Sequence, residues 1–198
     1  MDYTALCSPE NLFKAFDEFI CSKRKKKDVI EFATDLEENI FELSRELLSK
    51  TYNHGEYSRF HIWDPKFRII HKAKVRDRIV HHVIFAYLYE VFDKTFIFHS
   101  YSSRLNKGTH LGVENLHKMM RKVSCNFKKT GYALKCDVKK FFASVDHEIL
   151  FHLIVRKVHD KDILALIEGI IASFHTHTHT HTHTARDSAW EFDFANFC

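Results

Sequence analysis

Apolar residues recur at helical spacing through most of residues 1–174. In the first fifty residues this pattern predicts two helices, of which the first begins near Ser8-Pro9-Glu10 and the second spans Val29–Leu48. The apolar positions that define them are Leu12, Phe16, Phe19 and Ile20 in the first, and Phe32, Leu36, Ile40, Leu43 and Leu47 in the second. The basic run Lys23–Lys27 (KRKKK) separates them. It is either an exposed loop or a contact for a nucleic-acid backbone.

The pattern changes over residues 56–71, where two short mixed runs flank the turn residues Asp64, Pro65 and Lys66. This arrangement predicts a β-hairpin. Helical spacing returns over Val75–Lys94. Its expected buried side consists of Ile79, Val83, Ala86, Tyr87 and Phe92. After a loop at Ser100–Gly108, Thr109 is a candidate N-cap for a helix that runs to about Val123.

The apolar run Tyr132–Val138 predicts a strand, and two helices follow near Asp146–Val158 and Asp160–Phe174. The order is two helices, a hairpin, two helices, one strand and two helices, which predicts a mostly helical α+β fold. A single strand cannot bury itself, and the chain offers no obvious partner strand. We therefore expect an incomplete sheet.

Composition and charge are compatible with this picture. The 198 residues are 45% hydrophobic, and nineteen Phe with only five Gly and two Pro indicate dense helical packing. The formal net charge is +4. Residues 175–198 contribute −2 through one arginine and three acidic residues, so residues 1–174 carry +6. That excess suits a phosphate-backbone partner, but a solvated charged surface has the same composition.

The five cysteines are odd in number and show no CxxC spacing. This usage is typical of reduced thiols in the cytoplasm and argues against a disulfide framework or a zinc site. The first residues lack the pattern of a signal peptide, and no run approaches about 18 uninterrupted apolar residues. We expect a cytoplasmic protein without a membrane partner.

The segment Tyr132–Leu150 (YALKCDVKKFFASVDHEIL) carries the strongest chemical signal. Asp137 lies near the end of the predicted strand, and two lysines and two adjacent aromatic residues follow it. A carboxylate in these surroundings suits Mg²⁺, which is bound by one or two carboxylates, waters and substrate phosphates. The alternative is a buried-strand Asp that caps the next turn.

Three blocks of the sequence, in this order, resemble bacterial reverse transcriptases (RNA-directed DNA polymerases). DPKFRII followed by KVRDRIVHHVI is similar to their finger hairpin and following helix, and FDKTFIFHSYSSRLNKGTHLGVENL is similar to their next conserved block. LKCDVKKFFASVDHEIL resembles their metal-binding motif. The nearest resemblance is to the enzymes of diversity-generating retroelements, with group II intron-like and retron-type enzymes as near alternatives.

The resemblance implies the fingers and partial palm of a right-hand polymerase, with an incomplete antiparallel palm sheet. It divides the chain into an N-terminal helical segment (1–50), fingers (51–130), a partial palm with the first catalytic motif (131–174) and a tail (175–198). The implied cofactor is Mg²⁺. The implied partners are an RNA template, a DNA primer and deoxynucleoside triphosphates, and an accessory protein is compatible with them.

Position by position, the resemblance assigns Asp137 to the catalytic, metal-binding Asp, and the main-chain carbonyl of Val138 to the same metal. Phe142 matches the steric gate, since a ring packed under the sugar clashes with a 2′-OH; the alternative is a core Phe in a Phe-rich protein. Arg68 matches the finger arginine that clamps the incoming triphosphate, as a planar guanidinium can.

Other basic residues are less specific. Lys66 and Arg59 are weaker candidates for the triphosphate contact, or ordinary exposed hairpin residues. The candidates for contact with the nucleic-acid backbone are Arg76, Arg78, Arg104 and Lys107. The three arginines are equally compatible with structural ion pairs.

The tail begins with five His-Thr pairs at His175–Thr184, which suit metal binding. A (CA)n repeat also encodes His-Thr and is prone to slippage. Read one base out, the codon that spans Trp190 and Glu191 is GGG, and one allowed spelling of Ala185–Phe197 becomes HGIPLGNLTSQT. That resembles the next conserved block of the family, whereas ARDSAWEFDFANFC itself reads as loop-like. A frameshift inside the repeat explains both observations.

Two-metal nucleotidyl transfer needs carboxylates on both sides of the metal pair. The family's second acidic motif, Tyr-x-Asp-Asp, does not occur in this chain. We therefore expect a truncated polymerase that is inactive by itself. A non-catalytic nucleic-acid-binding module is the alternative, and a His-tract metal-binding protein is a third hypothesis.

Overall fold

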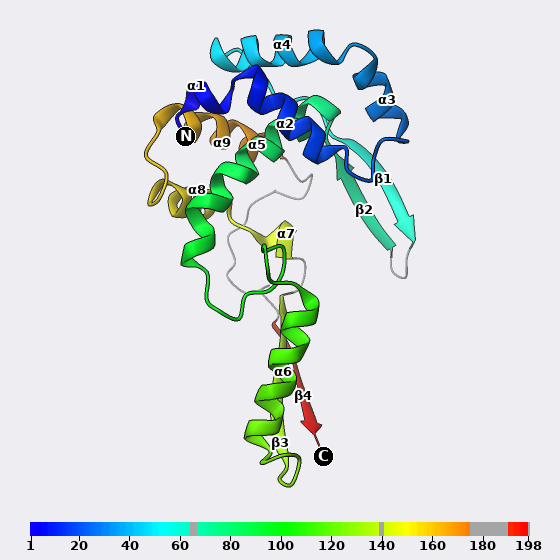
Figure 1. Ribbon diagram of the computed structural model, residues 1–198, viewed down its shortest axis with the longest axis vertical. Coiled ribbons are helices and arrows are strands. Elements are labelled where there is room, and N and C mark those ends of the chain that lie inside the picture. The colour runs from blue at the N-terminus through cyan, green and yellow to red at the C-terminus, as the bar shows by residue number, and fades with distance from the viewer. Residues whose placement is uncertain (64–66, 139–140, 175–189, 198) are drawn as a thin grey trace, which may run out of the picture. The chain divides into compact units, whose positions relative to one another are not determined.

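The computed structural model describes residues 1–63, 67–138, 141–174 and 190–197. Its helices are α1 (Tyr3–Leu6), α2 (Pro9–Phe19), α3 (Lys27–Thr34), α4 (Leu36–Leu48), α5 (Val75–Phe92), the 3₁₀ helix η1 (Asp93–Thr95), α6 (Thr109–Val123), α7 (Phe141–Ser144), α8 (His147–Val155) and α9 (Lys161–Ser173). Its strands are β1 (Ser58–Trp63), β2 (Phe67–Lys72), β3 (Gly131–Val138) and β4 (Trp190–Phe197). The fold is mostly helical α+β, as predicted (Figure 1).

The chain forms two compact units, one of residues 1–92 and 147–175 and the other of residues 93–146 and 176–198. The first unit holds the hydrophobic core, to which α1, α2, α4, α5 and α9 contribute. Its largest fully buried apolar side chains include Leu6, Leu12, Phe19, Ile40, Leu43, Leu47, Ile79, Val80, Val158 and Ile163. Burying one such side chain contributes about 1.5–3 kcal/mol, so these helices hold together mainly by their apolar stripes.

Local sequence signals set several helix ends. The hydroxyl of Ser8 accepts a hydrogen bond from the Asn11 N–H (3.3 Å), and Pro9 occupies the first turn of α2. This confirms the predicted helix start. At α9 the carboxylate of Asp160 accepts from two backbone N–H groups of the first turn and also from the Tyr3 N–H (3.2 Å). The cap of α9 thereby also fixes α1.

The first fifty residues contain four helices, so the prediction of two was wrong. The expected helix Val29–Leu48 is broken at Asp35, whose backbone (φ −120°, ψ 46°) is not helical. The side chain of Asn39 donates to the carbonyl of Phe32 (2.9 Å), which satisfies an acceptor near the break. With the break in place, both Phe32 and Leu36 pack against the core.

Helix α5 is buried mainly in its first half, at Val75, Asp77, Ile79, Val80, Val83 and Ile84. Ala86 is exposed, contrary to the prediction, whereas Tyr87 and Phe92 are partly buried against the core as expected. The helix ends at Phe92 and not at Lys94 as predicted; Lys94 belongs to η1. Helix α2 packs against α5. This contact determines which face of α5 is buried, and the spacing of apolar residues alone does not.

The predicted hairpin is present. Strands β1 and β2 pair antiparallel from Ser58 opposite Lys72 to Trp63 opposite Phe67, and the turn residues 64–66 lie outside the described residues. Large apolar side chains are exposed on both strands, namely Phe60, Ile62, Trp63, Phe67 and Ile69. The hairpin is therefore a surface element whose rings are open to solvent.

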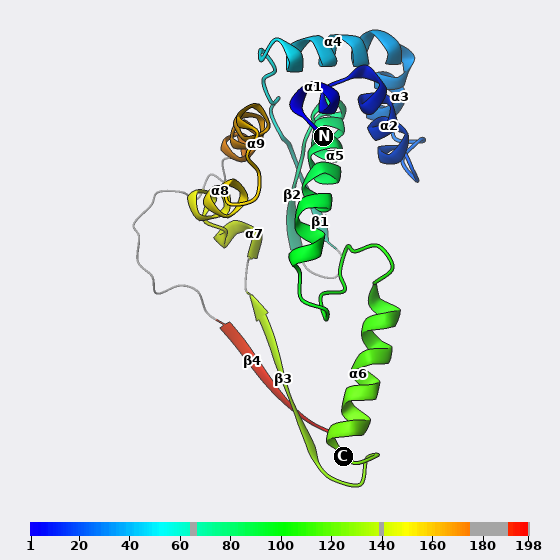
Figure 2. The ribbon, with the colours of Figure 1, turned by 60° about the vertical axis from the view of Figure 1, so that its left-hand side comes forward.

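In the second unit, β3 matches the predicted strand and pairs antiparallel with β4, from Gly131 opposite Phe197 to Val138 opposite Trp190 (Figure 2). The tail thus supplies a partner strand, although its sequence read as loop-like. The alternation in WEFDFANF is compatible with a strand, and the backbone of β3 needs a hydrogen-bonding partner.

Two further features of the described chain differ from or extend the sequence expectations. Helix α6 begins at Thr109, and Gly108 (φ 106°) is its N-cap residue, so Thr109 is the first helical residue and not the cap. Only glycine adopts this φ without strain.

No helix in the described segments combines the length and apolar character needed to cross a bilayer.

Candidate functional site

Asp137 is the penultimate residue of β3, and its side chain is exposed. Within the described residues its carboxylate forms no hydrogen bond or ion pair. The backbone register places Asp137 opposite Glu191 of β4. Val138, the other predicted metal ligand, ends the strand and is half-buried.

Asp137 offers one exposed carboxylate to a metal ion. No group of three or more His, Cys, Asp or Glu side chains that suits a metal occurs among the residues that the structure describes. Two-metal nucleotidyl transfer requires further carboxylates. Asp137 therefore fits one ligand of such a site and does not complete it.

Three other predictions fall partly or wholly outside the described residues. Lys66 falls in residues 64–66 and the His-Thr repeat His175–Thr184 in residues 175–189, and the structure describes neither range. The backbone of Phe142 belongs to α7, directly after Asp137 and its two lysines, but its side chain is not among those described. The gate role of Phe142 and the triphosphate role of Lys66 stay predictions.

Arg68 lies in β2 opposite Ile62, and Arg59 lies in β1 opposite His71. Both side chains are exposed, and neither forms an ion pair with a described residue. Their guanidinium groups are accordingly available for a phosphate. Arg68 belongs to the first unit and Asp137 to the second.

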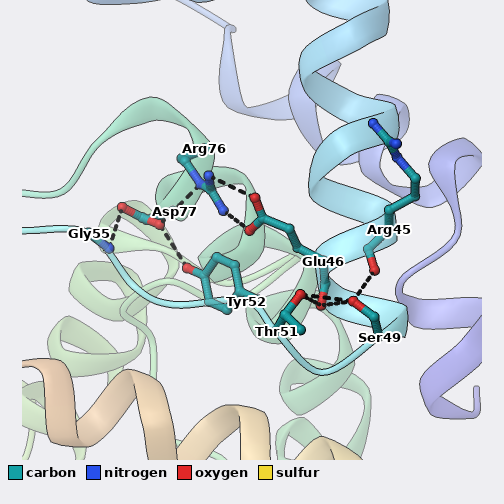
Figure 3. A network of polar contacts seen from close by, with 8 residues as sticks. All are labelled: Arg45, Glu46, Ser49, Thr51, Tyr52, Gly55, Arg76 and Asp77. Carbon is teal, nitrogen blue, oxygen red and sulfur yellow. Dashed lines mark hydrogen bonds and ion pairs between the residues drawn. The ribbon is translucent and has the colours of Figure 1, made fainter.

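Arg76 is part of a partly buried polar network around Asp77 that the sequence pattern did not predict (Figure 3). The carboxylate of Asp77 is fully buried, and it accepts hydrogen bonds from the Tyr52 hydroxyl (2.8 Å) and the Gly55 N–H (3.2 Å). Arg76 binds both carboxylate oxygens of Glu46, and its Nε lies 3.9 Å from Asp77 Oδ1. In this structure Arg76 thus serves as a structural ion pair.

The network also constrains the segment that leads into the hairpin. Burial, followed by the charge of Asp77, raises the pKa of Tyr52, so its hydroxyl keeps the proton that it donates. A Cβ at Gly55 would lie 3.0 Å from Asp77 Oδ2 and 3.0 Å from Lys74 Cδ. A side chain at residue 55 would therefore crowd the buried carboxylate, and Asp77 or Lys74 would have to shift to accommodate it.

Arg78 is held by a second acid. Asp28 of α3 binds both Arg78 and Lys72, the latter at 2.7 Å. Although burial opposes it, hydrogen bonds from Lys72 and Arg78 lower the pKa of Asp28. The guanidinium of Arg78 also lies 4.8 Å from the ring centroid of Phe19. Asp28 therefore ties α3, β2 and α5 together.

Arg104 and Lys107 organise the loop before α6. Arg104 Nε donates to Asp93 Oδ1 (2.7 Å), and its other nitrogens donate to the backbone carbonyls of Asp93, Ile97 and Ser100. Lys107 Nζ donates to the Phe98 carbonyl (2.7 Å) and lies 3.9 Å from the centroid of the Phe98 ring. Both side chains fold this loop onto itself.

A histidine pair lies beside the Asp77 network. His54 Nε2 and His81 Nε2 are 3.1 Å apart, and His54 Nδ1 is 2.7 Å from the carbonyl oxygen of Gly55. Because a carbonyl only accepts, His54 carries its proton on Nδ1, and His81 Nε2 donates to His54. Burial and then the charge of His54 lower the pKa of His81 to about 4. His81 is therefore neutral at physiological pH.

One feature of the sequence does indicate the polar network around Asp77. Asp77 is an acidic residue on the otherwise apolar face of α5, between Val75 and Ile79, and such a residue requires hydrogen-bonding partners. Nothing in the local sequence identifies Tyr52 or Gly55 as those partners, because the contacts span more than twenty residues.

Compared with protein-family models and with curated proteins, the sequence matches none. The functional assignment accordingly depends on the three sequence blocks and on the placement of their residues.

Proposed function

We propose that this chain forms the fingers and the first part of the palm of an RNA-directed DNA polymerase, most similar to the enzymes of diversity-generating retroelements. The observation that carries the proposal is Asp137, an exposed carboxylate near the end of a strand that has no ion-pair partner among the described residues, with a short helix containing Phe142 after it. The strand, the acid and the following aromatic residue occur in the order that the metal-binding motif of the family requires.

In this proposal Asp137 and the carbonyl of Val138 hold Mg²⁺, which supplies charge neutralisation at the phosphates. The guanidinium of Arg68 binds the incoming triphosphate, and the ring of Phe142 excludes a 2′-OH. The acids of Tyr-x-Asp-Asp, which complete such a site, are not in this sequence. No catalytic step is therefore assigned to this chain alone.

The hairpin supports the nucleic-acid part of the proposal. It exposes Arg59 and Arg68 together with the rings of Phe60, Trp63 and Phe67, of which Trp63 is 79% exposed. Cations that pair with phosphates and rings that stack on bases are the combination found in single-strand-binding surfaces. Solvent exposure of these rings is otherwise unfavourable.

A non-catalytic nucleic-acid-binding module is the second candidate. The observation that favours it is that both strands of the basic, aromatic hairpin are present, whereas the described residues do not supply the further acids of a metal site. RNA binding that is sensitive to salt, unchanged by Asp137→Ala and lost on replacing Arg59 and Arg68 supports this reading.

The deciding experiment starts from the nucleotide sequence through the His-Thr repeat and the following kilobase. We expect the shifted frame to encode GIPLGNLTSQ and, later, Tyr-x-Asp-Asp. The protein expressed in that frame then extends a DNA primer on an RNA template with Mg²⁺, and Asp137→Ala abolishes the extension. A closed shifted frame, or extension that survives Asp137→Ala, contradicts the proposal.

A further inference from the structure

The basic run Lys23–Lys27 forms the turn between α2 and α3, and its last residue is the first residue of α3 (Figure 1). Its backbone is fixed by hydrogen bonds from the Lys23 N–H to the Ile20 carbonyl (2.8 Å) and from the Lys26 N–H to the Lys23 carbonyl (2.9 Å). Ser22, just before the run, has a positive φ of 66°. Because the turn is already ordered, binding through it costs less conformational entropy than binding through a flexible tail.

Two cations from distant parts of the sequence join this turn. Asp28, the residue after the run, binds Lys72 of β2 and Arg78 of α5. One carboxylate therefore holds two cations in place beside the turn. We call the combined surface, made of Lys23–Lys27, Lys72 and Arg78, the basic turn patch.

Most of the charge on the basic turn patch is not neutralised within the described residues. Arg24, Lys25 and Lys26 are exposed and form no ion pair there, and Lys27 is 92% exposed, with Glu31 at 3.7 Å. Together with their ion-pair partners Asp28 and Glu31, the seven cations of the patch carry a net charge of +5. This exceeds the formal net charge of +4 of the whole chain.

The aromatic ring within the patch is not available for stacking. Phe19 is 2% exposed, and both the Lys23 ammonium and the Arg78 guanidinium lie 4.8 Å from its ring centroid. The patch thus presents cations without an open ring, in contrast to the hairpin. A surface of this kind suits regularly spaced phosphates better than unstacked bases.

We propose that the basic turn patch binds the phosphate backbone of a nucleic-acid duplex, without reading its sequence. This contact is additional to the candidate roles of Asp137 and Arg68 and does not depend on polymerase activity. Its binding is strongly salt-dependent, because each phosphate that a cation neutralises releases counterions.

The test compares two triple variants of the full 198-residue chain. The first is Arg24→Gln/Lys25→Gln/Lys26→Gln. The matched control is Lys118→Gln/Arg121→Gln/Lys122→Gln on α6, which removes the same charges from another exposed site. Fluorescence anisotropy with a labelled RNA duplex, a labelled DNA duplex and phosphatidylserine-containing vesicles measures binding, and circular dichroism confirms folding.

We expect the patch variant to lose about ten-fold or more in affinity for both duplexes at low salt. The slope of log K against log salt falls by about three, one for each lost phosphate contact. The control variant loses about two-fold or less. Equal losses in the two variants overturn the proposal, because net charge then explains binding. Unchanged duplex binding by the patch variant, or a patch-dependent preference for vesicles over both duplexes, also overturns it.

Discussion

The hydroxyl of Tyr52 donates a 2.8 Å hydrogen bond to the carboxylate of Asp77, which is 0% exposed. This contact fastens the segment between α4 and β1 to the first turn of α5. Since β1 begins only six residues after Tyr52, the Asp77 network anchors the base of the hairpin that carries Arg68. The orientation of a candidate phosphate-binding strand thus depends on a buried acid.

Replacing Tyr52 by Phe should destabilise the protein by about 1–3 kcal/mol, because a buried carboxylate loses one of its donors. Urea unfolding measures the change. Tyr132→Phe is the matched control, since Tyr132 is exposed on β3, and it should change stability by less than about 0.5 kcal/mol. Equal effects of the two substitutions would show that the hydrogen bond to Asp77 does not contribute.

Gly55→Ala tests the close approach of the backbone to Asp77. The new methyl group meets Asp77 Oδ2 and Lys74 Cδ at 3.0 Å, and we expect a loss of about 1–3 kcal/mol through strain and displacement of the carboxylate. Gly169→Ala in α9 meets no atom within 4 Å. Because alanine favours a helix over glycine, this control should stabilise the protein by up to about 1 kcal/mol. A neutral Gly55→Ala variant contradicts the prediction.

Acid should weaken the fold through His81. Its pKa is about 4 in the folded protein and about 6.5 in an unfolded chain, so below about pH 6.5 the unfolded state binds more protons. Stability is therefore fully present above that pH and is lost progressively as the pH falls towards 4. Allowing for partial exposure of the ring, we expect a loss of at most about 2 kcal/mol.

The measurement for His81 is the free energy of unfolding in urea across this pH range. The groups that face His81 are His54, Asp77, His82 and Arg78. Burial also lowers the pKa of His82, which adds a loss of the same sign. His81→Gln should flatten the pH dependence, and His82→Gln is the control for the contribution of the neighbouring ring. An unchanged slope in His81→Gln refutes the assignment to His81.

Asp137→Ala should leave stability within about 0.5 kcal/mol of the parent chain, because the carboxylate is exposed and unpaired among the described residues. Asp77→Ala should cost about 3–5 kcal/mol, since it removes the centre of a buried polar network. Thermal unfolding compares the two acids. A large loss on removing Asp137 would indicate a structural role in place of a ligand role.

The purified 198-residue chain should not extend a primer on an RNA template with Mg²⁺. The physical reason is that Asp137 alone does not supply the carboxylates on which two-metal transfer depends. A primer-extension assay with radiolabelled nucleotide checks this, with a known reverse transcriptase as the positive control. Detectable extension that is lost in Asp137→Ala would overturn the prediction of inactivity.

The sequence by itself determined the elements whose signals are local. The start of α2 follows from Ser8 and Pro9, the hairpin from two mixed runs around a turn, and the strand of Asp137 from an apolar run. These signals depend on caps, turns and side-chain periodicity within a few neighbouring residues, which is why they can be read from the order of residues alone.

Only the tertiary structure decided the features that join distant segments. It placed a helix break at Asp35, so that the apolar faces of α3 and α4 both pack on the same core. It also paired β3 with the tail strand β4. It also surrounded Asp77 with Tyr52 and Gly55 and joined the Lys23–Lys27 turn to cations of β2 and α5. A buried charge or an open strand edge specifies that partners are needed, but the packing of the whole chain decides which residues they are.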